Sequence, residues 1–100
     1  MKIKILKSAS QDLFDGYRFY EKQSEGLGTY FLDTLYSDID SLAIHGGIHP
    51  IYFNKYNRAL SKRFPFAIYY RTENNTVLVY AILDCRRNPA WIRKRIKKTG

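Results

Sequence analysis

The sequence has little of what small proteins use for cross-links, metal binding or membrane insertion. Cys85 is the single cysteine, so no internal disulfide can form, and no cluster of residues has metal-ligand spacing. No segment approaches the roughly 20 apolar residues of a membrane span. The first residues, Met1–Lys7, lack the apolar core of a signal peptide. We therefore expect a cytoplasmic protein that needs no metal, cofactor or membrane.

Motifs that carry catalysis in many enzymes are also missing. The chain has no glycine-rich phosphate loop, no HExxH helix and no GxSxG nucleophile elbow. His45 and His49 flank a glycine pair without a third ligand, a pattern that indicates solvated loop histidines. Asp12 and Asp15 lie one helical turn apart, which is typical of a solvated pair on a surface helix.

Acidic residues are scarce, and their distribution is uneven. The chain has 17 Lys and Arg against 9 Asp and Glu, a formal net charge of +8. Residues 1–50 contain five basic and seven acidic residues, a balance of −2, whereas residues 51–100 contain twelve and two, a balance of +10. The second half should attract an anionic partner, either a nucleic acid or an acidic protein segment.

The length and composition predict one folded domain over residues 1–100. A chain of 100 residues has room for one hydrophobic core, and 45% hydrophobic residues are enough to form it without cross-links. This apolar content is well above that of disordered chains.

The first half predicts a strand followed by two helices. Lys2–Lys7 alternates lysine with apolar residues, as a half-buried strand does. Ser8 and Gln11 fit a capping box for a first helix, in which Gly16 costs ~1 kcal/mol relative to alanine. The second helix runs from about Leu27 to Ile44, and Asp38 falls outside its apolar stripe. That stripe consists of Leu27, Phe31, Leu35, Ile39 and Leu42. The short link predicts an antiparallel helical hairpin.

The second half predicts a sheet and a short basic helix. Runs at 66–72 and 76–84 are rich in β-branched and aromatic residues and are joined by an asparagine turn. The second run is almost continuously apolar, so we expect a central strand covered on both faces. Strand-like residues at 51–57 and 58–64 precede them. We therefore predict an α+β fold of β-α-α-β-β-β order, with an antiparallel sheet and the hairpin on one face.

The tail begins with Asn88 and Pro89, a cap and first turn typical of a helix start. Ile92 and Ile96 are four residues apart, so one face of this basic helix can dock on the rest of the chain. The helix is too short to be stable alone, and docking or a partner must order it.

Cations at the margin of the predicted sheet are the candidate functional residues. They can bind phosphate or carboxylate, although a small sheet also exposes charges for solubility. Tyr70 and Trp91 could stack on bases or lie in the core. One of the paired arginines at the end of the last strand could instead pair with Asp84. The cations in question are Arg58, Lys62, Arg63, Arg71, Arg86 and Arg87.

Three motifs in this order resemble the RelE/ParE superfamily of bacterial toxins. The first is GLGTYFL at Gly26–Leu32, which opens the second helix. The second is RALSKRFPFAIYY at Arg58–Tyr70, and the third is VLVYAILDCRRNP at Val77–Pro89. The resemblance covers nearly the whole chain and is closest to the ParE-like, plasmid-stabilisation branch.

The resemblance implies the toxin of a type II toxin–antitoxin pair. Such a toxin is neutralised by a cognate antitoxin whose flexible segment wraps it, and the pair reaches operator DNA through the antitoxin. An acidic segment that orders on binding would suit the basic half of this chain.

The resemblance also separates two possible targets. RelE-like members cleave mRNA on the ribosome, and Arg58 and Arg86 fall where two of their basic catalytic residues are expected. Other positions depart from that set: Leu60, Ala67, and Trp91 or Ile92 stand where a lysine, an arginine and a terminal acid/base would be. ParE-like members inhibit DNA gyrase without being nucleases. We therefore expect a gyrase inhibitor.

Two alternatives stay open: a ribosome-dependent mRNA endoribonuclease, and a non-toxic relic that binds nucleic acid through its basic surface. No catalytic residue is assigned unless the protein is an endoribonuclease, in which case Arg58 and Arg86 are the candidates. The residues expected to contact the target or the antitoxin are Arg58, Lys62, Arg63, Arg86, Arg87, Trp91, Arg93 and Arg95.

Overall fold

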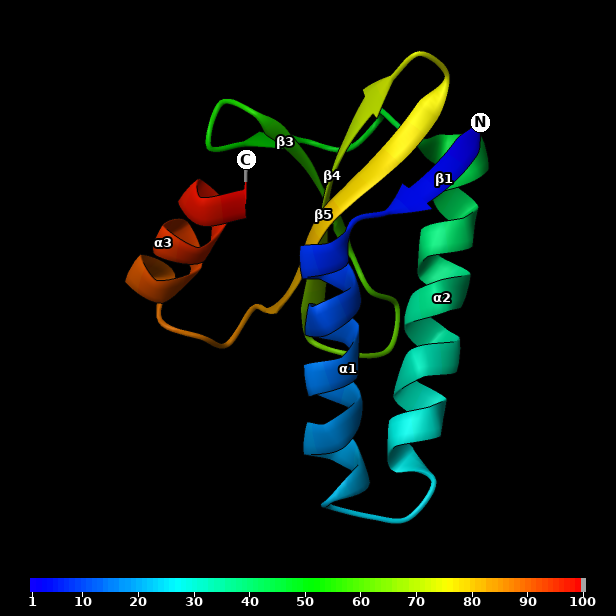
Figure 1. The fold of residues 1–100 in the computed structure, drawn as a ribbon, viewed down its shortest axis with the longest axis vertical. Helices are drawn as coiled ribbons and strands as arrows, with labels where there is room; N and C mark the ends of the chain where they lie inside the picture. The colour runs from blue at the N-terminus through cyan, green and yellow to red at the C-terminus, as the bar shows by residue number, and fades with distance from the viewer. Residues whose placement is uncertain (100) are drawn as a thin grey trace.

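A five-stranded sheet of order β1-β5-β4-β3-β2 separates a helical hairpin from a short C-terminal helix (Figure 1). The computed structural model describes residues 1–99. Its elements are β1 (Lys2–Ile5), α1 (Lys7–Glu21), α2 (Leu27–His45), β2 (Ile51–Tyr52), β3 (Tyr56–Leu60), β4 (Phe66–Glu73), β5 (Thr76–Asp84) and α3 (Pro89–Thr99). None of the described helices is long and apolar enough to span a membrane.

The main core lies between the helical hairpin and one face of the sheet. It includes the predicted stripe of α2 together with Leu13 and Tyr20 of α1 and Ile68 and Tyr70 of β4. Gly16 lets the two helices approach, because a Cβ at this position would lie 2.5 Å from the ring of Phe31. The predicted hairpin is therefore confirmed, and the glycine that weakens α1 has a packing role.

The second face of the sheet is covered in part by α3. Ile96 is 3% exposed and packs with Tyr56, Tyr69 and Leu83, and Ile92 lies beside this cluster. The Asn88 side chain accepts a hydrogen bond of 2.7 Å from the Ala90 N–H at the start of the helix. The predicted cap and the predicted docking face of the C-terminal helix are both confirmed.

A bulge at Tyr80 changes the face to which the side chains of β5 point. Tyr69 pairs with Ala81 and Tyr70 pairs with Val79, so Tyr80 is the extra residue on β5. The alternation of side chains changes parity there: Val79 and the later Ile82 both join the main core, while Ala81 joins the cluster under α3. β5 lies between β1 and β4 and is covered on both faces, as predicted.

The prediction of a wholly antiparallel sheet is wrong for one pair of strands. β1 pairs with β5 in parallel, with Lys2 opposite Thr76 and Ile5 opposite Val79, so the sheet is mixed. The hairpin of α1 and α2 separates β1 from the other strands in sequence, which allows β1 to lie parallel to a distant partner. The region 51–64 forms the two-residue β2 and then β3.

The predicted capping box is also wrong. Leu6 occupies the N-cap of α1 without a side-chain hydrogen bond. The Ser8 hydroxyl instead donates 2.7 Å to the carbonyl of Tyr80, and the Asp12 carboxylate accepts 3.0 Å from the N–H of Ile82. β1 pairs with β5 only as far as Val79. Side chains of α1 therefore satisfy the next polar groups of β5.

Two aspartates expected in solvent are engaged instead. Asp12 lies in the ion pair described below, while Asp15 remains exposed and accepts 2.9 Å from Gln11. Asp38 is 7% exposed and accepts 2.6 Å from the Ser61 hydroxyl. The carboxylates of Asp12 and Asp38 both join the helical hairpin to the sheet or its loops.

We predict that Gly16→Ala destabilises the fold by about 1 kcal/mol, because overpacking against Phe31 outweighs the better helix propensity of alanine. Urea denaturation would measure this change. Adding Phe31→Leu should recover part of the loss by making room for the new methyl group. Stabilisation by Gly16→Ala alone would contradict the close approach.

Candidate functional site

A groove lies between α3 and the edge of the sheet that carries β2 and β3. It consists of two adjoining pockets of about 220 and 350 Å³, which share Phe53 and Arg93. We call it the basic groove. It is lined by Tyr52, Phe53, Asn54, Lys55, Tyr56, Arg58, Tyr69, Cys85, Arg87, Pro89, Ile92, Arg93, Ile96 and Lys97.

The lining of the basic groove contains cations without carboxylates. Its cations are Lys55, Arg58, Arg87, Arg93 and Lys97, and among residues 1–99, which the structure describes, no Asp or Glu lines it. The excess of cations in this lining favours a positive potential at its surface. The basic groove can therefore attract phosphate or carboxylate groups.

Arg58 lies on the floor of the basic groove among neutral partners. Its Nε donates 3.3 Å to the Tyr69 hydroxyl and its Nη2 donates 3.4 Å to the Cys85 thiol. Its guanidinium carbon lies 4.8 Å from the centre of the Tyr52 ring. Burial lowers the pKa of Arg58, but the hydrogen bond to Tyr69 and the electrostatic effects of Tyr69, Cys85 and Tyr52 at high pH outweigh it and raise the pKa above its ordinary value. The charge is held in place without neutralisation.

Aromatic side chains form the outer wall of the basic groove. Tyr52 and Phe53 are 40% and 39% exposed, so part of each ring is accessible. Phe53 and Asn54 have φ angles of 57° and 56°, in the left-handed region that a phenylalanine rarely adopts. The tight turn between β2 and β3 imposes this conformation and presents the Phe53 ring to the groove.

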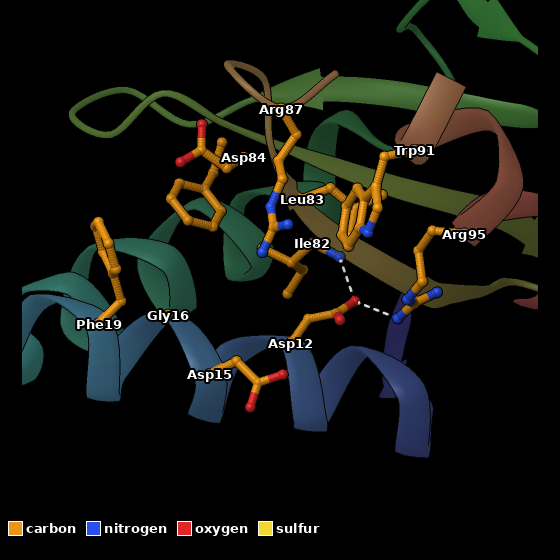
Figure 2. Close-up of a pocket in the computed structure, with 11 residues that line it drawn as sticks. Asp12, Asp15, Gly16, Phe19, Ile82, Leu83, Asp84, Arg87, Trp91 and Arg95 are labelled. Carbon is orange, nitrogen blue, oxygen red and sulfur yellow. Dashed lines mark hydrogen bonds and ion pairs between the residues drawn. The ribbon is translucent and has the colours of Figure 1, made fainter. Parts of the chain in front are cut away.

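A second pocket, of about 370 Å³, lies on the other side of α3 and has charges of both signs (Figure 2). Arg95 donates 2.6 Å to the Asp12 carboxylate, which also accepts from the N–H of Ile82. Burial raises the pKa of Asp12 despite these bonds. Arg87, which lines both pockets, lies 4.1 Å from the centre of the Trp91 ring.

The predicted contact residues separate into three groups. Arg58, Arg87 and Arg93 meet in the basic groove, with Trp91 stacked on Arg87. Arg95 joins α3 to Asp12, and its second contact is the carbonyl of Ser8 at 3.3 Å. The other predicted cations lie elsewhere.

Arg86 forms the pairing with Asp84 that the sequence left open. Two bonds of 3.0 and 2.8 Å join its guanidinium to the carboxylate, and the Tyr20 hydroxyl lies 3.5 Å away. The side-chain hydrogen bond from Arg86 holds the pKa of Asp84 below its ordinary value. Arg86 is therefore engaged at the end of β5, beside the helical hairpin.

Lys62 and Arg63 lie near α2, away from the basic groove. The N–H of Lys62 donates 3.3 Å to Asp38, and the Arg63 guanidinium donates 3.3 Å to the Tyr30 hydroxyl. Lys62 also lines a pocket of about 390 Å³ with His45 and His49.

Sequence reasoning missed the residues that give the basic groove its shape. Tyr52, Phe53 and Lys55 come from the aromatic and basic stretch 51–56, which was interpreted only as strand. Tyr69 lies in the strand predicted at 66–72, and the strand pattern gives no sign that its hydroxyl holds Arg58. Tyr70, considered for base stacking, is fully buried.

The arrangement is suited to binding anions. The described residues that line the basic groove include no His, Asp or Glu, and the groups bonded to Arg58 that can exchange a proton are the Tyr69 hydroxyl and the Cys85 thiol. In the described part of the chain, no group of three or more His, Cys, Asp or Glu could hold a metal ion.

Comparison with known proteins locates the fold among solved structures. No family model matches the sequence, and no curated protein matches it. A chain of the solved structure "Chromosomal ParDE TA system from P. aeruginosa" superimposes with a TM-score of 0.70 and 20% sequence identity. The match covers 82% of this chain and 92% of that chain. The two chains share a fold. The fold implied by the sequence resemblance thus occurs in a ParDE system.

We predict that iodide quenches the fluorescence of Trp91 more strongly than caesium at low salt, because nearby arginines concentrate anions. Arg87→Ala should reduce the advantage of iodide, while Lys22→Ala, an equal charge change at the far end of α1, should not. Trp91 is the single tryptophan, so the signal is unambiguous. Equal quenching by both ions would contradict a positive surface around this ring.

We predict that Asp12→Ala lowers the free energy of unfolding by about 2–3 kcal/mol, because Arg95 and the Ile82 N–H both lose a partly buried partner. Asp12→Asn should cost less, since its amide oxygen can still accept from Ile82. Denaturant unfolding checks both. The matched control is Asp15→Ala, which should change stability by no more than about 0.5 kcal/mol.

Proposed function

We propose that this chain is the toxin of a type II toxin–antitoxin pair and that the basic groove binds an acidic segment of the cognate antitoxin. The observation that carries the proposal is the carboxylate-free groove, on a fold shared with a chain of a ParDE system. The antitoxin neutralises the toxin by covering this surface, and operator DNA is reached through the antitoxin.

An acidic, partly apolar segment fits the basic groove in two ways. Carboxylates meet Arg58 and Arg87 at one end and Arg93 and Lys97 at the other, where charge complementarity speeds association. Apolar side chains of the segment cover the exposed part of the Phe53 ring between these cations. A segment that orders on binding can follow the whole length of such a groove.

The proposed target is DNA gyrase. The absence of His, Asp and Glu from the lining supports a binding surface more than a nuclease centre, as do the departures at Leu60 and Ala67 from the RelE-like set. Arg58, Arg87, Arg93 and Trp91 are the proposed contacts with target or antitoxin. Gyrase lies in the cytoplasm, which is where we expect the protein to act.

The test is an in vitro supercoiling assay with purified gyrase and this chain. We expect inhibition with trapped, cleaved DNA, and recovery when the antitoxin is added. The double variant Arg58→Ala/Arg93→Ala should weaken binding of the antitoxin at least tenfold, about 1.4 kcal/mol. Lys22→Ala is the control with unchanged binding.

Other outcomes would redirect the proposal. Intact supercoiling together with codon-linked cuts in mRNA on translating ribosomes would support the endoribonuclease, with Arg58 and Arg86 as its first candidates. Intact supercoiling and intact mRNA, with salt-sensitive binding to nucleic acid and no growth arrest, would support the non-toxic relic.

A further inference from the structure

The loop between α2 and β2 is hydrogen-bonded to Tyr70, a buried residue of β4. The N–H of Gly47 donates 2.9 Å to the Tyr70 hydroxyl, and Nδ1 of His49 hydrogen-bonds the same hydroxyl. Tyr70 is 0% exposed and belongs to the main core. We call these two contacts the Tyr70 clasp. The prediction that both histidines are solvated is wrong for His49, which is half-buried. His45 is exposed, as predicted.

The geometry selects one protonation state of the imidazole. The arrangement that satisfies every group has the Tyr70 hydroxyl accepting from the N–H of Gly47 and donating its one proton to Nδ1 of His49. His49 is then neutral and carries its proton on Nε2. A second proton on Nδ1 would face the hydroxyl proton, and a fully buried hydroxyl has no water to turn to.

The Tyr70 clasp is connected to the wall of the basic groove by short links. The carbonyl of His49 accepts 2.8 Å from the Asn57 side chain, and the carbonyl of Pro50 accepts 2.9 Å from the N–H of Arg58. β2 follows immediately and has only two paired residues, Ile51 and Tyr52. A strand this short depends on the loop before it for its position.

We propose that the Tyr70 clasp is a pH-sensitive device that positions the aromatic wall of the basic groove: charging His49 releases the loop, and β2 with Tyr52 and Phe53 then detaches from β3 and opens the groove. This regulation bears on the surface to which we assign antitoxin binding. The opening itself is a property of the isolated chain, and it can be measured whether or not that assignment holds.

Burial and the neighbouring His45 favour the neutral form of His49. His45 of α2 and Lys62 of the β3–β4 loop line the same pocket, and Asp38 there already accepts from Ser61 and the Lys62 N–H. Burial first, and then the charge of His45, lower the pKa of His49 below its ordinary 6.5. The folded state therefore binds this proton less well than the unfolded state. The stabilisation that the Tyr70 clasp gives the folded state is complete above pH 6.5, and it is lost as the pH falls through the lowered pKa of His49.

Amide hydrogen exchange of the full chain, corrected for intrinsic rates, tests the device at about pH 7.5 and about pH 5. Exchange at Gly47 and Arg58, whose N–H groups are bonded within the loop region, should accelerate several-fold at the lower pH. Exchange at Ser61, which is bonded to Phe66 of β4, should not change and serves as the internal control. Nitrogen NMR at neutral pH should show the His49 proton on Nε2.

Three variants separate the clasp from general acid loosening. His49→Gln retains a neutral acceptor and should abolish the pH dependence, whereas His45→Gln should retain it. In Tyr70→Phe, the amides of Gly47 and Arg58 should exchange fast at both pH values. Protection of the Ser61 amide reports whether this variant is still folded. A pH dependence that persists in His49→Gln, or its absence from the wild-type chain, would overturn the proposal. So would a His49 proton on Nδ1 at neutral pH.

Discussion

The edge of β5 beyond Val79 is the constraint on which the arrangement of this chain depends. β1 ends its pairing there, while β5 continues through the Tyr80 bulge and must have its polar groups satisfied. Ser8 and Asp12 supply the missing partners from α1. Asp12 then binds Arg95, so one carboxylate joins the hairpin, the central strand and α3.

Ion pairs within the fold determine where cations without carboxylate neighbours are left at the surface. Arg95 and Arg86 are engaged by Asp12 and Asp84. The Arg95–Asp12 pair joins α3 to α1 (Figure 2), and Arg86 also reaches the Tyr20 hydroxyl of α1, so both pairs lie toward the hairpin. On the other side of α3 the lining contains cations without carboxylates. The acidic residues are unevenly distributed along the sequence, and in the fold the carboxylates of Asp12 and Asp84 lie on the hairpin side of α3. The other side of α3 is left with cations, and these form the basic groove.

Much of the fold was readable from local patterns, because those patterns report burial directly. The helical spacing of Leu35 and Ile39 predicted the hairpin, and Asn88 before Pro89 predicted the start of α3. The errors all concern partners that are distant in sequence. Ser8 looked like a helix cap because its true acceptor, the Tyr80 carbonyl, lies 72 residues away, and the same holds for Asp12 and Ile82.

The sequence by itself determined the elements, the charge asymmetry and the resemblance to a toxin fold, because each depends on residue type and short-range spacing. The tertiary structure alone decided which cations share a surface. Arg58 and Arg93 are 35 positions apart and meet in one groove, while Arg63 lies against α2. The physical reason is that chain reversals and a strand bulge set side-chain direction over long distances, and no local pattern encodes that direction.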